Sequence, residues 1–239
     1  MHRPGAPPEA SRRGRPAGSV PPSLPRTTGR IPVSSPVLRY AGTVVLVGGA
    51  YYGSARLGLM LSLVERNVTP LWPPTGIAVV ALLVLGRSVW PGVAVAAFLV
   101  NAPISAGLGA AAVTAVGNTL APLVAATLLR RVGFRPEIDR QRDALAIVFL
   151  GALVSMAVSA TVGTVTLAAS GSIPWSGFWP AWTVWWTGDA MGVLVVAPFL
   201  LTVVGVVRHR TTLRRVVSSW PAPSRPSSSC CWRPASRAG

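Results

Sequence analysis

Six long apolar runs, separated by short polar links, constrain this chain more than any other feature. They lie at about residues 41–62, 73–86, 89–105, 108–129, 144–168 and 182–207. A helix needs about 20 residues to cross the hydrocarbon of a bilayer, and four of the runs reach that length. The second and third are shorter, and because only Gly86-Arg87-Ser88 separates them they predict a tight helical hairpin or a partly re-entrant pair. The runs together predict an all-α fold, a polytopic transmembrane helix bundle.

The arginines predict the orientation of this bundle. The chain has no lysine, so arginine supplies every fixed positive side-chain charge. Seven arginines precede the first run, and the links after the second, fourth and sixth runs also carry arginine, whereas the alternate links carry only Arg66. Positively charged loops stay in the cytoplasm. The alternation therefore predicts about six spans in a plasma membrane, with both termini cytoplasmic.

Composition divides the chain into three parts. Residues 1–39 are rich in Pro, Arg, Ser and Gly and predict a disordered basic cytoplasmic arm. Residues 40–210 hold the apolar runs and form the expected integral membrane domain. Residues 211–239 are basic and polar, which predicts a disordered tail, and their composition suggests an out-of-frame or truncated end.

Side chains that enzymes and metal sites need are scarce. His2 and His209 are the only histidines and lie outside the runs, so intramembrane histidines cannot hold haem or another metal. Cys230 and Cys231 are adjacent and form no disulfide framework. No catalytic residue, metal site or cofactor is predicted. The net charge of +16 lies in the links and the terminal segments and forms no stripe on a folded domain, so the expected partner is the lipid bilayer and not nucleic acid.

Asp189 is the most informative single residue, because an acid inside an apolar run is costly and needs a partner. At helical spacing it shares a face with Trp182, Trp185 and Trp186. A tryptophan wall above a carboxylate is suited to a cation or a sugar-like ligand. A structural acid paired with a neighbouring helix explains the same pattern, and both interpretations stay open.

Other polar groups are expected in the same outer half of the bundle. Arg56 is the only arginine inside an apolar run, and it either pairs with Asp189 or extends to the outer headgroups. Asn101 and Asn118 predict hydrogen bonds between helices, with ligand contact as the alternative. Trp72 lies in a Pro-rich outer link and is explained either by an interfacial aromatic belt or by a ligand site.

Small residues at four-residue spacing predict close helix contacts. The fifth run has such a ridge at Gly151, Ser155, Ser159 and Gly163, the sixth has Gly188 and Gly192, and the first has Ala50, Ser54 and Gly58. These ridges indicate a compact bundle and say nothing of what it binds.

Several short segments, taken in order, carry a resemblance to a known family. They are Leu71-Trp72-Pro73-Pro74-Thr75-Gly76-Ile77-Ala78, Leu85-Gly86-Arg87, Trp90-Pro91-Gly92, Asn101, Gly117-Asn118-Thr119-Leu120, and Trp182 through Trp185-Trp186-Thr187-Gly188-Asp189-Ala190-Met191-Gly192 to Pro198. Over about residues 38–210 the chain resembles the bacterial membrane-associated sensor domain of the first type (MASE, type one). Within these motifs the resemblance implies structural roles for Pro73, Pro74, Gly76, Pro91, Gly188, Gly192 and Pro198.

The resemblance implies a multi-pass sensory input domain of the bacterial inner membrane. Such domains precede histidine kinases of two-component systems, or modules that make or degrade cyclic di-GMP, and respond to a signal molecule or membrane partner protein that is not identified. They often act as homodimers, and members are usually credited with more spans than the six expected here. Two other functions stay open, a small transporter or channel and a non-functional truncated fragment.

Overall fold

The computed structural model describes the backbone of residues 36–61 and 71–218, and the side chains of residues 36–60 and 71–207. Most of the predicted arm, the link that carries Glu65 and Arg66, and the tail from residue 219, with Cys230 and Cys231, lie outside the described residues. The described residues all belong to one compact unit, and only this unit is described below.

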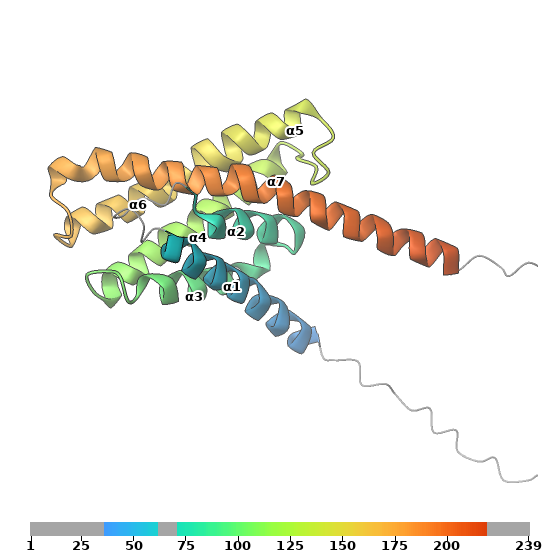
Figure 1. The fold of residues 1–239 in the computed structure, drawn as a ribbon, viewed down its shortest axis with the longest axis horizontal. Helices are drawn as coiled ribbons and strands as arrows, with labels where there is room; N and C mark the ends of the chain where they lie inside the picture. Colours follow the sequence, from blue (N-terminus) through green and yellow to red (C-terminus); the bar gives the residue numbers. More distant parts are fainter. Residues whose placement is uncertain (1–35, 62–70, 219–239) are drawn as a thin grey trace, which may run out of the picture. The chain divides into compact units, whose positions relative to one another are not determined.

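Helices make up all the regular structure in the described residues, which confirms the all-α prediction (Figure 1). Each predicted apolar run coincides with a helix or with consecutive helical segments. In chain order these are α1 (Pro36–Leu61), α2 (Pro73–Val84), η2 (Arg87–Val89), α3 (Trp90–Asn101), α4 (Leu108–Arg131), α5 (Gln141–Ala146), η3 (Ile147–Val154), α6 (Ser155–Ala169), η4 (Trp175–Gly177) and α7 (Phe178–Ser218).

Three of these helical segments are long and apolar enough to cross a membrane, namely Leu108–Arg131, Gln141–Ala169 and Trp175–Val207. The second of them is continuous through a π-helical stretch, η3, between α5 and α6. The two helices α2 and α3 have 12 residues each. At 1.5 Å per residue each is about 18 Å long, short of the roughly 30 Å hydrocarbon thickness.

The short helix α2 lies at the centre of the bundle and packs against α1, α4 and α7. Eight of its 12 residues are buried, because it is apolar on every side and has no polar face to turn outward. Its side chains join two hydrophobic clusters, one with α4, α6 and α7 and one with α1, α3 and α4. The helix α3 packs mainly against α1 and α4.

The predicted small-residue ridges agree with the packing in two of the three runs. A Cβ on Gly163 would lie 2.5 Å from the Trp185 ring, and one on Gly192 would lie 2.0 Å from the Trp72 carbonyl oxygen. In α1 the predicted ridge is wrong in part, because Ala50 is exposed. There the close contact is made by Gly48, whose Cβ would lie 3.0 Å from the carbonyl oxygen of Gly92 in α3.

Hydrogen bonds bring several arginine-bearing links to one end of the bundle. Tyr40, near the start of α1, donates its hydroxyl to the Ser88 carbonyl in the link after α2, at 2.9 Å. Arg130, at the end of α4, donates to the carbonyl groups of Leu82 and Leu83 at the end of α2. The start of α1, the end of α2 and the end of α4 therefore lie together.

Candidate functional site

The two most specific sequence motifs meet where the N-terminus of α2 packs against the middle of α7. The Trp72 N–H donates to the Gly188 carbonyl at 3.0 Å, so the contact is backbone to backbone. A Cβ on Gly76 would lie 2.3 Å from the Gly192 carbonyl oxygen, and one on Gly192 would lie 2.0 Å from the Trp72 carbonyl oxygen. Real Cβ atoms do not come this close to other atoms, so this approach of α2 and α7 requires glycine at both positions.

The Asp189 carboxyl lies at this junction and is only 3% exposed. Thr75, in the first turn of α2, donates its hydroxyl to Asp189 Oδ1 at 2.7 Å. Because Pro73 and Pro74 open α2 and have no N–H, this side-chain hydroxyl is one of few donors at that end. The other oxygen, Oδ2, has no hydrogen-bond partner among the described residues. The positive end of the α2 dipole favours negative charge at this place.

A short chain of polar groups continues from Asp189 into α6 and α4. The Ser159 hydroxyl and the Trp185 indole both face the Asp189 carboxyl. Ser159 donates to Asn118 Oδ1 at 2.8 Å and accepts the Trp185 Nε1–H at 3.2 Å. The cluster of Thr75, Asn118, Ser159, Trp185 and Asp189, which we call the polar cluster, therefore joins α2, α4, α6 and α7.

The helix α1 reaches the polar cluster through Tyr51, which is 2% exposed. Its hydroxyl faces the Trp72 side chain and the Asp189 carboxyl. Trp72 also covers Gly58 of α1, with ring atoms 3.5 Å from where a Cβ would be. Trp72 thus ties the start of α2 to both α1 and α7.

The opposite end of α2 is held by a positive charge. Arg130 of α4 donates to the carbonyl of Leu82 and, at 3.2 Å, to that of Leu83. These are among the last carbonyl groups of the helix, which have no partner within it, and the helix dipole favours a cation there. A carboxyl from α7 and a guanidinium from α4 therefore complement the two ends of one buried helix.

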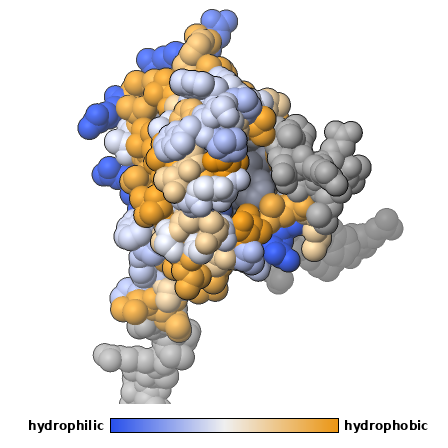
Figure 2. All heavy atoms as spheres, turned by 90° about the vertical axis from the view of Figure 1, so that its left-hand side faces the viewer, coloured by the Kyte–Doolittle hydropathy of each residue, from blue (hydrophilic) through white to orange (hydrophobic). Residues whose placement is uncertain are grey.

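Trp182 and Trp186 stack on each other, with ring centroids 5.7 Å apart, and do not join the polar cluster. Trp182 Nε1 donates to Thr161 Oγ1 at 3.0 Å, and Trp186 Nε1 donates to the Leu153 carbonyl at 2.8 Å. Ring contacts continue from Trp182 through Trp179 and Phe178 to Trp175. Figure 2 faces this end of the bundle, where pale residues of intermediate hydropathy lie among hydrophobic ones. Of the three tryptophans expected near the carboxyl, only Trp185 contacts the polar cluster.

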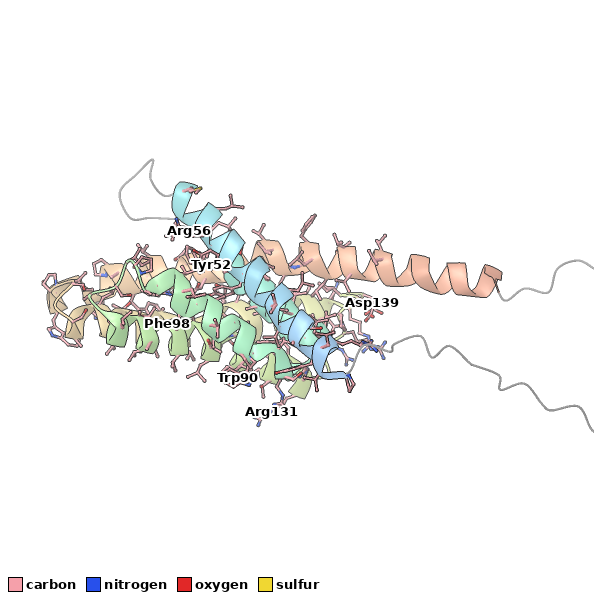
Figure 3. All side chains as sticks on the ribbon, turned by 90° about the horizontal axis from the view of Figure 1, so that it is seen from below. Tyr52, Arg56, Trp90, Phe98, Arg131 and Asp139 are labelled. Carbon is pink, nitrogen blue, oxygen red and sulfur yellow. The ribbon has the colours of Figure 1, made fainter. Side chains whose placement is uncertain are left out.

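Arg56 and Asn101 lie apart from the polar cluster. Arg56 is exposed on the last turns of α1 (Figure 3), and the only ion pair between described residues joins Arg140 to Asp139. Among the described residues Arg56 therefore forms no ion pair with Asp189, and its extension to the outer headgroups stays a prediction. Asn101 is buried, but its amide donates to the Ala97 carbonyl of its own helix at 2.8 Å.

The motif prolines occupy helix starts and one helix interior. Pro73 and Pro74 open α2, and Pro91 is in the first turn of α3, where a missing N–H costs nothing. Pro198 lies inside α7, and Thr202 donates its hydroxyl to the Pro198 carbonyl at 2.9 Å.

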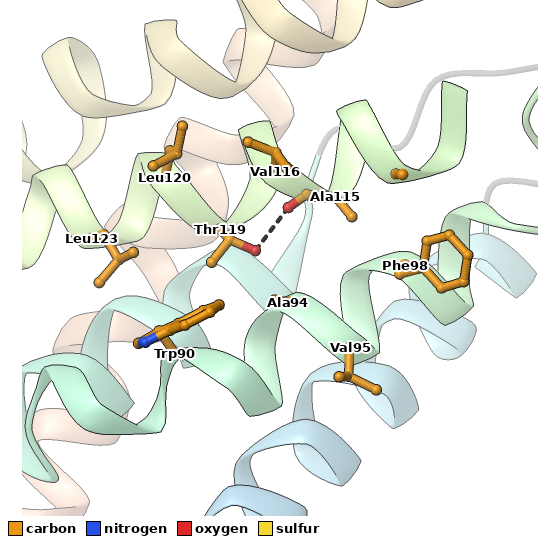
Figure 4. A pocket seen from close by; sticks show the side chains of 10 residues that line it. Trp90, Ala94, Val95, Phe98, Ala115, Val116, Thr119, Leu120 and Leu123 are labelled. Carbon is orange, nitrogen blue, oxygen red and sulfur yellow. Dashed lines mark hydrogen bonds between the residues drawn. The ribbon is translucent and has the colours of Figure 1, made fainter. Parts of the chain in front are cut away.

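A separate apolar groove of about 550 Å³ runs between α3 and α4 (Figure 4). Trp90 and Phe98 line it from α3, and Val116 and Leu123 line it from α4. The one hydroxyl in its wall, that of Thr119, already donates to the Ala115 carbonyl at 2.7 Å. The lining of the groove is almost entirely hydrocarbon.

Sequence reasoning did not assign Thr75, Ser159, Tyr51 or Arg130 to the site. Thr75 lies within a quoted motif and Ser159 within a predicted ridge, so both were visible as packing residues only. Nothing in the sequence marks Tyr51 or Arg130 as a site residue. An interfacial tyrosine or a loop arginine has the same sequence pattern whether or not it belongs to a site.

Comparison with known proteins gives one match. The sequence profile of the MASE1 family matches residues 43–225. No curated protein and no solved structure matches the chain.

Proposed function

Because the chain belongs to the MASE1 family of membrane-associated sensor domains, we propose that it is the sensory input part of a bacterial signalling system. In this proposal the bundle resides in the inner membrane and spans it six times, with both ends in the cytoplasm. It passes a signal to a histidine kinase or a cyclic di-GMP module. The family is one of input domains and not of catalysts.

One observation supports this proposal above the others, the junction of α2 with α7 around a buried carboxyl. The helix α2 is short, central, and complemented at its ends by Asp189 of α7 and Arg130 of α4. The backbones of α2 and α7 touch at this junction with no room for a Cβ between them. A shift of α2 by a fraction of an ångström would therefore break these contacts. Packed elements of this kind change between discrete arrangements and do not deform continuously.

The helix α7 provides the route by which such a shift would reach the output. It runs without interruption from Phe178 to Ser218, past the end of the predicted apolar run at residue 207. Movement at Gly188 and Gly192 would therefore displace the arginine-bearing end of the same helix. An output module joined there would receive a rotation or a translation of α7.

The proposed orientation is tested by reporter fusions after residues 135, 175 and 212. The arginine distribution predicts cytoplasm, outside and cytoplasm, respectively. A cytoplasmic signal at position 175 would contradict the six-span arrangement and leave the sensory role to be judged separately.

The sensory role is tested by placing the full chain before a histidine-kinase output and measuring autophosphorylation in membranes. We expect Thr75→Val and Gly76→Ala to change the basal output several-fold, because each disturbs the junction of α2 and α7. Gly205→Ala, in α7 where a Cβ meets nothing within 4 Å, is the matched control. If Thr75→Val and Gly76→Ala proteins insert normally and give unchanged output, the domain is a passive anchor and the proposal is wrong.

A further inference from the structure

The Asp189 carboxyl is enclosed without a full counter-charge. It is 3% exposed, its Oδ1 accepts from Thr75, and its Oδ2 has no partner among the described residues. Groups from every packed element face it: Tyr51 of α1, Thr75 of α2, Asn118 of α4 through Ser159 of α6, and Trp185 of α7 itself. Of these only Tyr51 titrates, and a phenol supplies no positive charge.

An ionised carboxyl in this place is costly. Isolated charges in an apolar interior are normally neutralised or paired. Arg56 is exposed and forms no ion pair with Asp189 in the described part of the chain. The N-terminus of α2 offers only about half a positive charge. A proton on Oδ2 removes the remaining charge and needs no additional space.

The surrounding hydrogen bonds have the polarity that a protonated Oδ2 requires. Ser159 has one hydroxyl proton, which it gives to Asn118 Oδ1, and it accepts from Trp185. Its oxygen has a second acceptor position, and the Asp189 carboxyl that it faces can donate there when protonated. The bonds then run in one direction, from Asp189 to Ser159 to Asn118.

Loss of the proton reverses this arrangement. An ionised carboxyl needs donors, and the Ser159 hydroxyl and the Trp185 N–H that face it carry one proton each. If Ser159 turns to Asp189, Asn118 Oδ1 loses its donor, so the hydrogen bond moves from the contact of α6 with α4 to that of α6 with α7. The protonation state of one carboxyl thereby selects between two contacts of the bundle.

We propose that Asp189 is a reversible proton-binding site and that the signal relayed by this domain is the occupancy of that site. Only the second part of this proposal, that occupancy of the site is the relayed signal, rests on the proposed sensory function. A proton from water is taken up by Oδ2 and returned to water, and no other covalent bond is formed or broken. The ligand is therefore a proton.

Infrared difference spectroscopy of the full chain in lipid nanodiscs tests the binding site directly. All six acidic side chains and the C-terminal carboxyl absorb when protonated. The test therefore follows the one component of the C=O absorption that is lost in Asp189→Asn and persists in Asp143→Asn, and we expect this component to grow as the pH falls. Asp143 is the matched control, since it is 2% exposed and also has one unpartnered oxygen, but it lies in the first turn of α5, away from the polar cluster. Ser159→Ala should displace this component, because the protonated carboxyl loses its acceptor. If no titrating component of the C=O absorption is lost in a folded Asp189→Asn protein, the proposal is overturned.

The kinase fusion separates this inference from the proposed function. Asp189→Asn keeps an acceptor for Thr75 and a donor for Ser159, so it imitates the protonated state. We expect its output to equal that of the wild type at low pH and to stop responding to pH. Should the Asp189-dependent component titrate while fusion output ignores pH, the proton site stands and its signalling role is refuted. Should the junction variants alter output while no Asp189-dependent component titrates, the sensory function stands and the proton site is refuted.

Discussion

The two ends of α2 are held in different ways. At its N-terminus the backbone of residues 72–76 lies against that of residues 188–192, at distances that exclude a Cβ. At its C-terminus a long arginine side chain, itself exposed, reaches across from α4 to two carbonyl groups. The first contact cannot adapt without moving a helix, whereas the second can follow a moving helix by changing side-chain torsions. The N-terminal junction is the place where a small change would be felt, and the C-terminal end can serve as a pivot.

The largest expected effect comes from adding one methyl group at the N-terminal junction. Gly192→Ala should lower the free energy of unfolding by about 3 kcal/mol, because its Cβ would overlap the Trp72 carbonyl and force α2 and α7 apart. Thermal unfolding in detergent measures the loss. The same change at Gly205, in the same helix but facing open space, should have little effect. Equal losses for Gly192→Ala and Gly205→Ala would show that the close approach is not a source of stability.

A smaller loss is expected when the carboxyl at that junction is removed. Asp189→Ala leaves the buried Thr75 hydroxyl without an acceptor and should cost about 2 kcal/mol, whereas Asp189→Asn, which keeps the acceptor, should cost less. A double-mutant cycle with Thr75→Val measures the coupling, expected at about 1 kcal/mol. Fully additive losses would mean that the hydrogen bond contributes nothing.

At the other end of α2 the expected loss is smaller again. Arg130→Gln removes the cation beside the last carbonyl groups of α2, and because that guanidinium is solvent-accessible the cost should be about 1 kcal/mol. Arg131→Gln is the control, since Arg131 is exposed and adjacent in sequence. Thermal stability in detergent compares the two. If Arg130→Gln costs more than Gly192→Ala, the contrast between a rigid and an adaptable end is reversed.

The smallest expected effect is the coupling between Arg56 and Asp189. Because Arg56 is exposed and unpaired with Asp189 in the described residues, Arg56→Gln and Asp189→Asn should have additive effects on unfolding. If the double variant recovers stability, the result would support the sequence-based hypothesis that Arg56 and Asp189 form an ion pair.

Helix positions were predictable because apolar periodicity and length are local properties. All six apolar runs overlap helices of the structure, and the ridge at Ser159 and Gly163 does face neighbouring helices. The ends of the runs were less accurate, since α7 continues to Ser218, beyond the predicted end of the sixth run at residue 207. The ridge predicted in α1 was wrong in part because Gly48 and Ala50 are both small residues. Only the position of α3 shows which of the two makes the close contact.

The sequence by itself determined that this chain is an all-α, membrane-associated protein with one acid inside an apolar run, because hydropathy and charge act residue by residue. It also marked the Trp72–Gly76 and Trp185–Gly192 segments as special. Only the tertiary structure decided that these two segments touch, that Asp189 faces Thr75 and Ser159 and not Arg56, and that Arg130 holds the other end of α2. These facts depend on which helices become neighbours and on their rotation about their axes. Packing of backbone against backbone sets both, and no pattern along a single helix records them.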